Sequence, residues 1–319
     1  MFWTWLCGKK LDKVAEADLP LTEVPFRWQS QGGFSHPQWS SIHPWVFCSY
    51  PPAQQPGVYR ALTTAWLERV CHEGGAGFGL ADSRHFRLLS PFSPTKSKMF
   101  LQFFEEARRR IDGLLGDLAF RDALGPHVVM IFRNSQQYWK YASHFFGDGE
   151  VGGQGGVCVQ EGYVHVVSYD QMAQSLQGIL AHEFVHNLLV HRKMPLWLEE
   201  GLAELLPMQM RLSAGHLGDI ASEAGALRQC WQKHGLTDFW SGESFFAADE
   251  RQKASYQLSE VLTRLILDGP NASRFGEFVA AAERTDGGER AALSVLGYSL
   301  NDAVSKFLGP GRWLGADRA

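Results

Sequence analysis

The spacing of apolar residues along this chain of 319 residues predicts where its helices and strands form. Apolar residues spaced three or four apart predict helices, whereas short runs of β-branched and aromatic residues predict strands. The helical period predicts helices over residues 58–71, 95–118, 136–145, 168–194, 196–204 and 254–265. Strands are predicted over 85–89 and 128–132, and a tight hairpin is predicted to pair 157–160 with 163–167, with Gly162 at positive φ. Ser168 or Asp170 is the predicted N-cap of the fourth helix.

The region before residue 58 has no sustained period. Proline recurs between residues 20 and 57 and interrupts any helical pattern, so we expect irregular or short-stranded structure there. The segment carries too many aromatic residues for a solvated linker, and we expect it to pack as a cover on the rest of the protein. The glycine-rich stretch 74–79 predicts a turn or hinge. The chain is therefore divided into an N-terminal aromatic and proline-rich region of unknown fold, 1–82, and a second domain, 83–319.

Composition and charge exclude several classes of protein. Hydrophobic residues make up 45% of the chain and charged residues 20%, which is typical of a globular protein. A formal net charge of -4 offers no basic field to a nucleic-acid backbone, so we expect no nucleic-acid partner. No apolar run is long enough to span a bilayer.

Two further features bear on location. The charges of the first ten residues follow the apolar stretch, which is the wrong order for a signal peptide. The five cysteines are odd in number and include no Cys-x-x-Cys pair, which favours buried thiols in a reducing compartment. We expect a cytoplasmic protein, with peripheral membrane contact through the aromatic N-terminus as the weaker alternative.

The helix predicted before Pro195 carries the residues with metal-binding chemistry. His182 and His186 are four residues apart, so both imidazoles lie on one helix face, one turn apart, where they can share a metal ion. Neutral imidazoles leave Zn²⁺ able to acidify a bound water, and Glu183 can take the proton of that water and pass it to a leaving amine. The alternative is a pair of histidines satisfied within the core, so the pattern needs a third ligand.

Three carboxylates follow in the next predicted helix. Glu200 and Glu204 share a face at i, i+4, and Glu200 could complete a site of two histidines and one glutamate with one position left open for water. Glu204 could accept the remaining N–H of a ligand histidine and fix its tautomer. Glu199 points about 100° away from Glu200 and is expected to face solvent. The alternative is an acidic helix surface.

These residues resemble a known family. His182 to His186, followed by Pro195-Leu196-Trp197-Leu198-Glu199-Glu200-Gly201-Leu202-Ala203-Glu204, is similar to the His-Glu-x-x-His plus Trp-Leu-x-Glu-Gly-x-Ala pattern of gluzincin metallopeptidases, specifically bacterial peptidase MA-like domains. The resemblance implies that Glu200 is the third zinc ligand and Glu183 the general base. With the order of the predicted elements, it implies an α+β, zincin-like catalytic domain over 83–319, with a mixed sheet, a metal-binding helix and a helical C-terminal half.

The resemblance extends more weakly to two other segments. Tyr256 is similar in place to a helical tyrosine that stabilises the oxyanion in aminopeptidase N-type gluzincins; an ordinary surface tyrosine explains the sequence equally well. In zincins an edge strand before the metal helix binds an extended peptide, and Val157, Cys158 and Val159 are the matching segment here, unless the hairpin only covers the core. The chain lacks the Gly-x-Met-x-Asn segment that holds a substrate amino terminus, so exopeptidase activity does not carry over.

Three functions follow from these patterns. The first is a Zn²⁺-dependent peptidase acting on a peptide or protein substrate. The second is a non-catalytic gluzincin-like protein that binds a peptide or partner, which a cleft plugged by residues 20–57 would favour. The third is metal-assisted hydrolysis of another amide or ester. Among the other polar residues, His165 is expected to face a cleft or solvent, and Arg108, Arg109 and Arg110 a solvated helix face.

Overall fold

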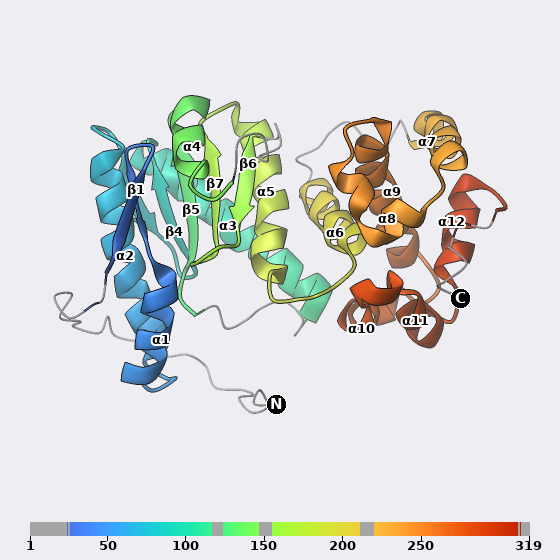
Figure 1. Ribbon diagram of the computed structural model, residues 1–319, viewed down its shortest axis with the longest axis horizontal. Coiled ribbons are helices and arrows are strands. Elements are labelled where there is room, and N and C mark those ends of the chain that lie inside the picture. The colour runs from blue at the N-terminus through green and yellow to red at the C-terminus, as the bar shows by residue number, and fades with distance from the viewer. Residues whose placement is uncertain are drawn as a thin grey trace.

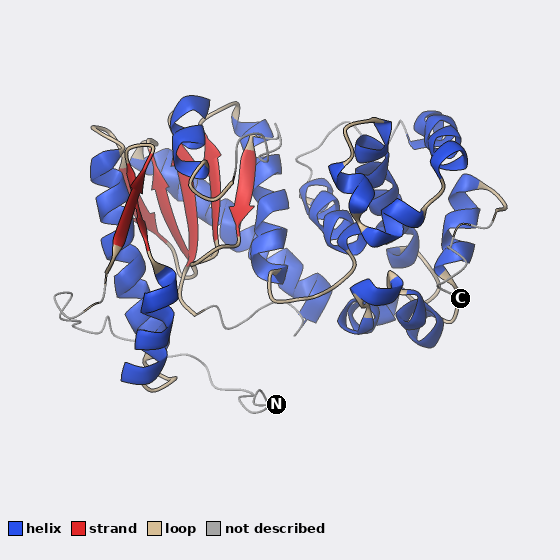
Figure 2. Cartoon of the chain, in the orientation of Figure 1, coloured by secondary structure: helices blue, strands red, loops and turns tan. Residues whose placement is uncertain are grey.

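The computed structural model describes residues 24, 26–116, 124–146, 155–210, 220–311 and 313. A mixed sheet, five-stranded in the described residues, lies in the N-terminal half, with helices beside it (Figure 1, Figure 2). Its order is β3-β4-β5-β7-β6, with β4, β5 and β7 parallel and the two edge strands antiparallel to their neighbours. The strands are β3 (Gly79–Asp82), β4 (Phe86–Ser90), β5 (His127–Phe132), β6 (Gly156–Val159) and β7 (His165–Tyr169). The predicted α+β class and mixed sheet are confirmed, and β3, which begins at the last residue of the predicted turn 74–79, was not predicted.

Helices cover both faces of the sheet. Successive residues of β5 point to opposite faces, and all six are buried, which explains its unbroken apolar run. On one face, Val129 and Ile131 pack with α3 (Pro94–Leu115) and α5 (Ala173–Leu189). On the other, Met130 and Phe132 pack with α1 (Trp39–Ser49), α2 (Gln55–Glu73) and α4 (Ser135–Ala142). We refer to these as the α5 face and the α2 face.

The N-terminal region covers the α2 face. A separate hairpin of β1 (Trp28–Gln31) and β2 (Phe34–Pro37) leads into α1 and α2, and Phe34 packs edge-on against Phe132 of the sheet. The predicted cover is therefore confirmed, but the prediction of no helix before residue 58 is wrong. Pro44 lies inside α1, whose residues Trp39, Ile42 and Val46 are buried at helical spacing, so packing of this face outweighs the lost hydrogen bond.

The predicted boundary between residues 82 and 83 falls in the turn that joins β3 to β4. These two strands pair antiparallel, from Gly79 with Ser90 to Asp82 with Arg87. The α2 face buries residues from both sides of this boundary in one hydrophobic cluster. The structure tests no division into domains, and that division stays a prediction.

The C-terminal half is helical over its described residues. The long helices α6 (Leu196–Gln209) and α9 (Glu250–Leu267) pack on each other, and α6 also packs on α5, which joins the two halves. Around them lie α7 (Ile220–His234), α8 (Thr237–Ser241), α10 (Phe275–Ala281), α11 (Glu289–Ala291), α12 (Leu300–Leu308) and the short helical turns η3 (Glu243–Phe246), η4 (Ala272–Arg274), η5 (Arg284–Asp286) and η6 (Ala292–Leu296).

The predicted start of the metal-binding helix is wrong by several residues. Ser168 stays in β7, where it pairs with Ile131 of β5 and Gly156 of β6, and α5 begins only at Ala173. Met172, predicted on the apolar stripe, is 78% exposed. Pairing on both sides of a central strand here outweighs the local capping signal, and the Ser168 hydroxyl donates to the Gly155 carbonyl at 2.6 Å instead of capping the helix.

The predicted hairpin forms with a longer connection. Val159 pairs with His165, so five residues join β6 to β7 instead of a tight turn, and Gly162 has the expected positive φ of 72°. His165 faces neither cleft nor solvent. It is 1% exposed on the α2 face, where Tyr141 Oη lies 2.8 Å from its Nε2 and the Tyr163 carbonyl oxygen lies 2.7 Å from its Nδ1. The glycine-rich sequence of 147–156 predicts a flexible loop, of which residues 147–154 lie outside the described part of the chain.

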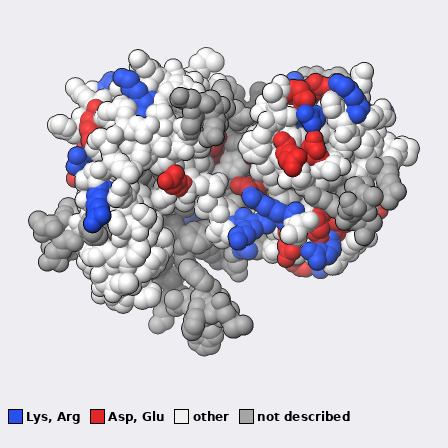
Figure 3. All heavy atoms as spheres, viewed as in Figure 1, with Lys and Arg blue, Asp and Glu red and all other residues white. Residues whose placement is uncertain are grey.

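One arginine of the predicted solvated face is buried. Arg108 lies on the same stripe of α3 as Phe104 and Ile111 and is 9% exposed, whereas Arg109 and Arg110 pair with Glu106 at the surface. Among the described residues, no helix is both long and apolar enough to cross a membrane. Basic and acidic side chains are interspersed on the face drawn in Figure 3 (Figure 3).

Candidate metal centre

Helix α5 carries the two histidines on the face of the sheet opposite the N-terminal cover. It packs against β6 and β7 on one side and α6 on the other, which buries most of its circumference. His186 is 9% exposed and Glu183 7% exposed, so the polar groups of the motif are held within packed structure. The described residues 26–57 lie on the α2 face and do not plug this site.

Helix α6 brings the carboxylates to α5. Trp197 is fully buried, and its Nε1–H donates to the Gly287 carbonyl at 2.9 Å, which fixes the start of the helix. Gly201 allows α6 to lie close to α9, because a Cβ atom there would stand 2.1 Å from Thr263 Oγ1 and 2.5 Å from the Ser259 carbonyl oxygen. The glycine of the motif is therefore required by helix packing, and it sets the position of the neighbouring Glu200.

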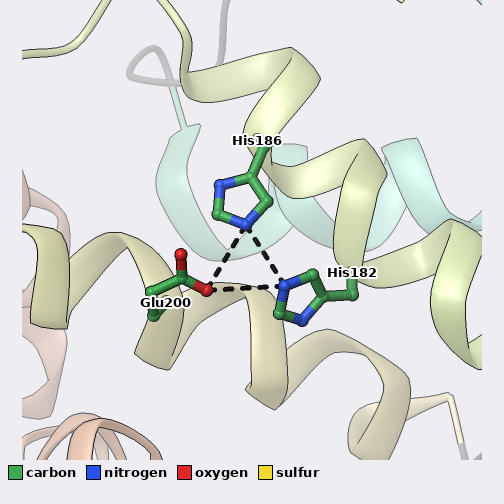
Figure 4. A group of neighbouring side chains, drawn as sticks. All are labelled: His182, His186 and Glu200. Atoms are coloured by element: carbon green, nitrogen blue, oxygen red, sulfur yellow. Dashed lines mark hydrogen bonds and ion pairs between the residues drawn. The ribbon is translucent and has the colours of Figure 1, made fainter. Parts of the chain in front are cut away.

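Three potential ligand atoms converge between the two helices (Figure 4). The Nε2 atoms of His182 and His186 lie 3.2 Å apart, and Glu200 Oε2 lies 3.4 Å from the first and 3.5 Å from the second. Two atoms bound to one Zn²⁺ at about 2.05 Å with tetrahedral angles are about 3.3 Å apart. The three separations fit a tetrahedral ion with one position left open.

Further carboxylates contact the outer nitrogens of both histidines. Glu204 Oε1 lies 3.4 Å from His182 Nδ1, as the sequence predicted. Glu199 Oε1 lies 3.0 Å from His186 Nδ1, and Glu199 is 5% exposed, so the prediction that it faces solvent is wrong. Arg284 Nη2 stands 3.5 Å from the other Glu199 oxygen. Glu199 therefore orients His186, and Arg284 compensates its buried charge.

The donor set of the site fits a divalent cation. When the imidazoles are neutral, a carboxylate beside each Nδ1 favours the tautomer that directs the Nε2 lone pair toward Glu200. Glu200 Oε2 is buried and has no hydrogen-bond partner among the described residues. Two lone pairs and a carboxylate oxygen this close repel one another unless a positive charge lies among them. The residues thus fit Zn²⁺, which takes nitrogen and oxygen ligands of this kind.

The pKa values of His182 and Glu200 also indicate that this group of side chains favours a positive charge. Burial disfavours a charge on His182, but contacts with Glu200 and Glu204 outweigh it and raise its pKa to about 9. Burial likewise works against ionisation of Glu200, yet the two histidines hold its pKa at about 2. The carboxylate is therefore ionised at neutral pH, and a cation that binds here displaces protons from the histidines.

Glu183 is held against the edge strand. Its Oε2 accepts the backbone N–H of Cys158 at 2.7 Å, which occupies one of its two carboxylate oxygens. Strand β6 pairs only with β7 in the described sheet, so the predicted segment Val157, Cys158 and Val159 forms an edge beside α5. The thiol of Cys158 is buried, and burial together with the Glu183 and Glu199 charges raises its pKa.

Tyr256 lies on α9, half-buried, with its ring packed edge-on against Phe245 at a centroid distance of 5.3 Å. Helical spacing puts it on the same face as Ser259 and Thr263, the residues that meet Gly201 of α6. The structure therefore brings Tyr256 to the side of α9 that faces α6. Its part in oxyanion stabilisation stays a prediction.

Comparison with known proteins adds no identification, because no family model matches the chain and no curated protein has a significantly similar sequence.

Proposed function

We propose that this protein is a zinc-dependent peptidase of the gluzincin type with a zincin-like fold. The observation that carries the proposal is the convergence of His182, His186 and Glu200 at separations suited to one tetrahedral ion. Glu183 lies beside this group, and a purely structural metal site has no use for such a carboxylate. A bound Zn²⁺ would polarise the scissile carbonyl and lower the pKa of a water in the open position.

Each residue of the site would then have a separate role. His182, His186 and Glu200 hold the ion, while Glu199 and Glu204 keep both imidazoles in the tautomer that binds it. Glu183, fixed by the Cys158 N–H, takes the proton from the attacking water and returns it to the leaving amine.

Substrate binding would use the outward edge of β6. Apart from the Cys158 N–H, which Glu183 accepts, this edge can pair with an extended peptide through main-chain hydrogen bonds, which favours a peptide or protein substrate. Tyr256 would donate a hydrogen bond from its hydroxyl to the oxyanion.

Metal content measured on three proteins tests the proposal first. We expect about one zinc per chain in the native protein by plasma mass spectrometry, loss of zinc in His186→Ala, and retention in Glu183→Gln. A peptide-library screen should then show cleavage by the native protein and none by Glu183→Gln, which keeps the metal but lacks the base.

Each result has a separate meaning. Native protein that takes up no zinc when it is supplied would refute the metal site. Zinc retained with equal activity in Glu183→Gln would refute peptidase chemistry through that base and leave a metal-containing binding protein.

A further inference from the structure

A second group of metal-ligand side chains lies on the helical half, away from α5 (Figure 1). Cys230 and His234 are four residues apart on α7, so they share one helix face, and Glu250 is the first residue of α9. The sulfur, an imidazole nitrogen and a carboxylate oxygen all lie within 4.8 Å of one another. His234 Nε2 is 3.0 Å from Glu250 Oε1. Sequence spacing alone does not reveal the group, because Glu250 comes from a different helix.

We propose that Cys230, His234 and Glu250 form a second, thiolate-containing site for a divalent transition metal that clamps α7 to α9. Thiolate, imidazole and carboxylate together suit Zn²⁺ and Co²⁺ and do not suit Mg²⁺ or Ca²⁺, which take oxygen ligands. The proposal does not depend on the peptidase function, since the two sites share no residue.

The geometry needs only small side-chain movements to bind an ion. Ligand atoms around one tetrahedral ion are about 3.3 to 3.7 Å apart, so the widest separation must close by about 1 Å. The Glu250 side chain is 52% exposed and Cys230 is half-buried, so rotations of this size do not disturb the core. Solvent reaches the site, and a water can complete the coordination.

Lys233 competes with a metal for the same carboxylate. Its Nζ lies 2.8 Å from Glu250 Oε1, and its side chain is 66% exposed, so it can turn into solvent when an ion binds. Binding replaces the thiol proton of Cys230 with the metal, and the thiolate and carboxylate charges together neutralise a divalent ion. Removal of the lysine should therefore strengthen metal binding.

Cobalt titration of the full chain under reducing conditions tests the proposal. A thiolate bound to Co²⁺ gives a near-ultraviolet charge-transfer band, which a site of two histidines and a glutamate does not give. We expect the native protein to show this band, and His182→Ala, which lacks a ligand of the first centre, to complete it at about one Co²⁺ per chain. Cys230→Ser should lose the band, and His234→Ala and Glu250→Gln should bind Co²⁺ at least about tenfold more weakly. Lys233→Ala should bind Co²⁺ more tightly, by up to about fivefold, the strength of an exposed ion pair.

Two controls separate this site from other thiols and from the first centre. Cys48→Ser removes an exposed thiol and should leave the band unchanged, as should His182→Ala. Circular dichroism establishes that each variant is folded, and the His234 and Glu250 variants decide the matter if Cys230→Ser does not fold. Absence of the band in the native protein, or its persistence in the Cys230 variant, would overturn the proposal.

Discussion

Gly201→Ala is the substitution that most directly tests how packing positions the candidate centre. The added Cβ would stand 2.1 Å from Thr263 Oγ1 and 2.5 Å from the Ser259 carbonyl oxygen. The threonine hydroxyl can rotate, but the carbonyl belongs to the backbone of α9 and cannot. Since ordinary contacts of this kind are about 3.4 Å, α6 must move away from α9 by about 1 Å.

The expected cost follows from two opposed effects. Overpacking a well-packed contact costs about 1 to 3 kcal/mol, whereas replacing a helical glycine by alanine gains up to about 1 kcal/mol. We expect a net loss of about 2 kcal/mol in the free energy of unfolding. Glu200 is the adjacent residue, and ligand distances tolerate only about 0.2 Å, so zinc affinity should fall by at least about tenfold.

Urea unfolding monitored by circular dichroism, together with competition for zinc against a chromophoric chelator, measures both effects. Gly178→Ala is the matched control, because Gly178 lies within α5 and a Cβ there would meet no atom within 4 Å. That variant should gain about 0.5 to 1 kcal/mol and keep its zinc affinity. If Gly201→Ala is as stable as Gly178→Ala and binds zinc equally well, the close approach of α6 and α9 does not position Glu200.

Two further predictions concern buried histidines. Glu199→Gln should weaken zinc binding by about 10- to 100-fold, because His186 loses a charged partner. Arg284→Met removes an exposed side chain 3.5 Å from Glu199 and should weaken zinc binding by less than about fivefold. Calorimetric titration with zinc measures both effects. Equal effects of the two changes would mean that Glu199 does not act on His186 directly. Burial lowers the pKa of His165 to about 4, although the Tyr163 carbonyl oxygen opposes this by accepting a hydrogen bond from the imidazole. The unfolded chain therefore binds the proton first as the pH falls. The stability that neutral His165 contributes is therefore complete above pH 6.5 and should fall by about 3 kcal/mol as the pH drops from 6.5 toward 4. His165→Gln, which can keep both hydrogen bonds without titrating, should lose less over this range; an equally steep loss would place the acid sensitivity elsewhere.

Local spacing was enough to predict that His182 and His186 share a helix face, but the choice of Glu200 from the next helix also needed the family resemblance. The i, i+4 relation of His182 and His186 depends only on helix geometry, so it holds wherever the helix begins. The start of that helix could not be predicted, because Ser168 is a good cap residue and the partners that retain it in the sheet are distant in sequence. Likewise, α1 forms across Pro44 only because three of its residues find a buried surface.

The burial of Glu199 is indicated by the apolar residues on every side of it in the sequence. A helix with one solvated face should carry its polar residues on that face, and this expectation placed Glu199 in water. Around the three carboxylates, however, α6 is apolar on every side, from Leu196 and Trp197 to Leu202 and Ala203. The Glu204 side chain is 38% exposed, but Glu199 and Glu200 are buried where α6 packs between α5 and α9, so neither can rely on solvent. Each then needs a cationic or hydrogen-bonding partner, and the histidines of α5 are the groups that such a helix would have to meet.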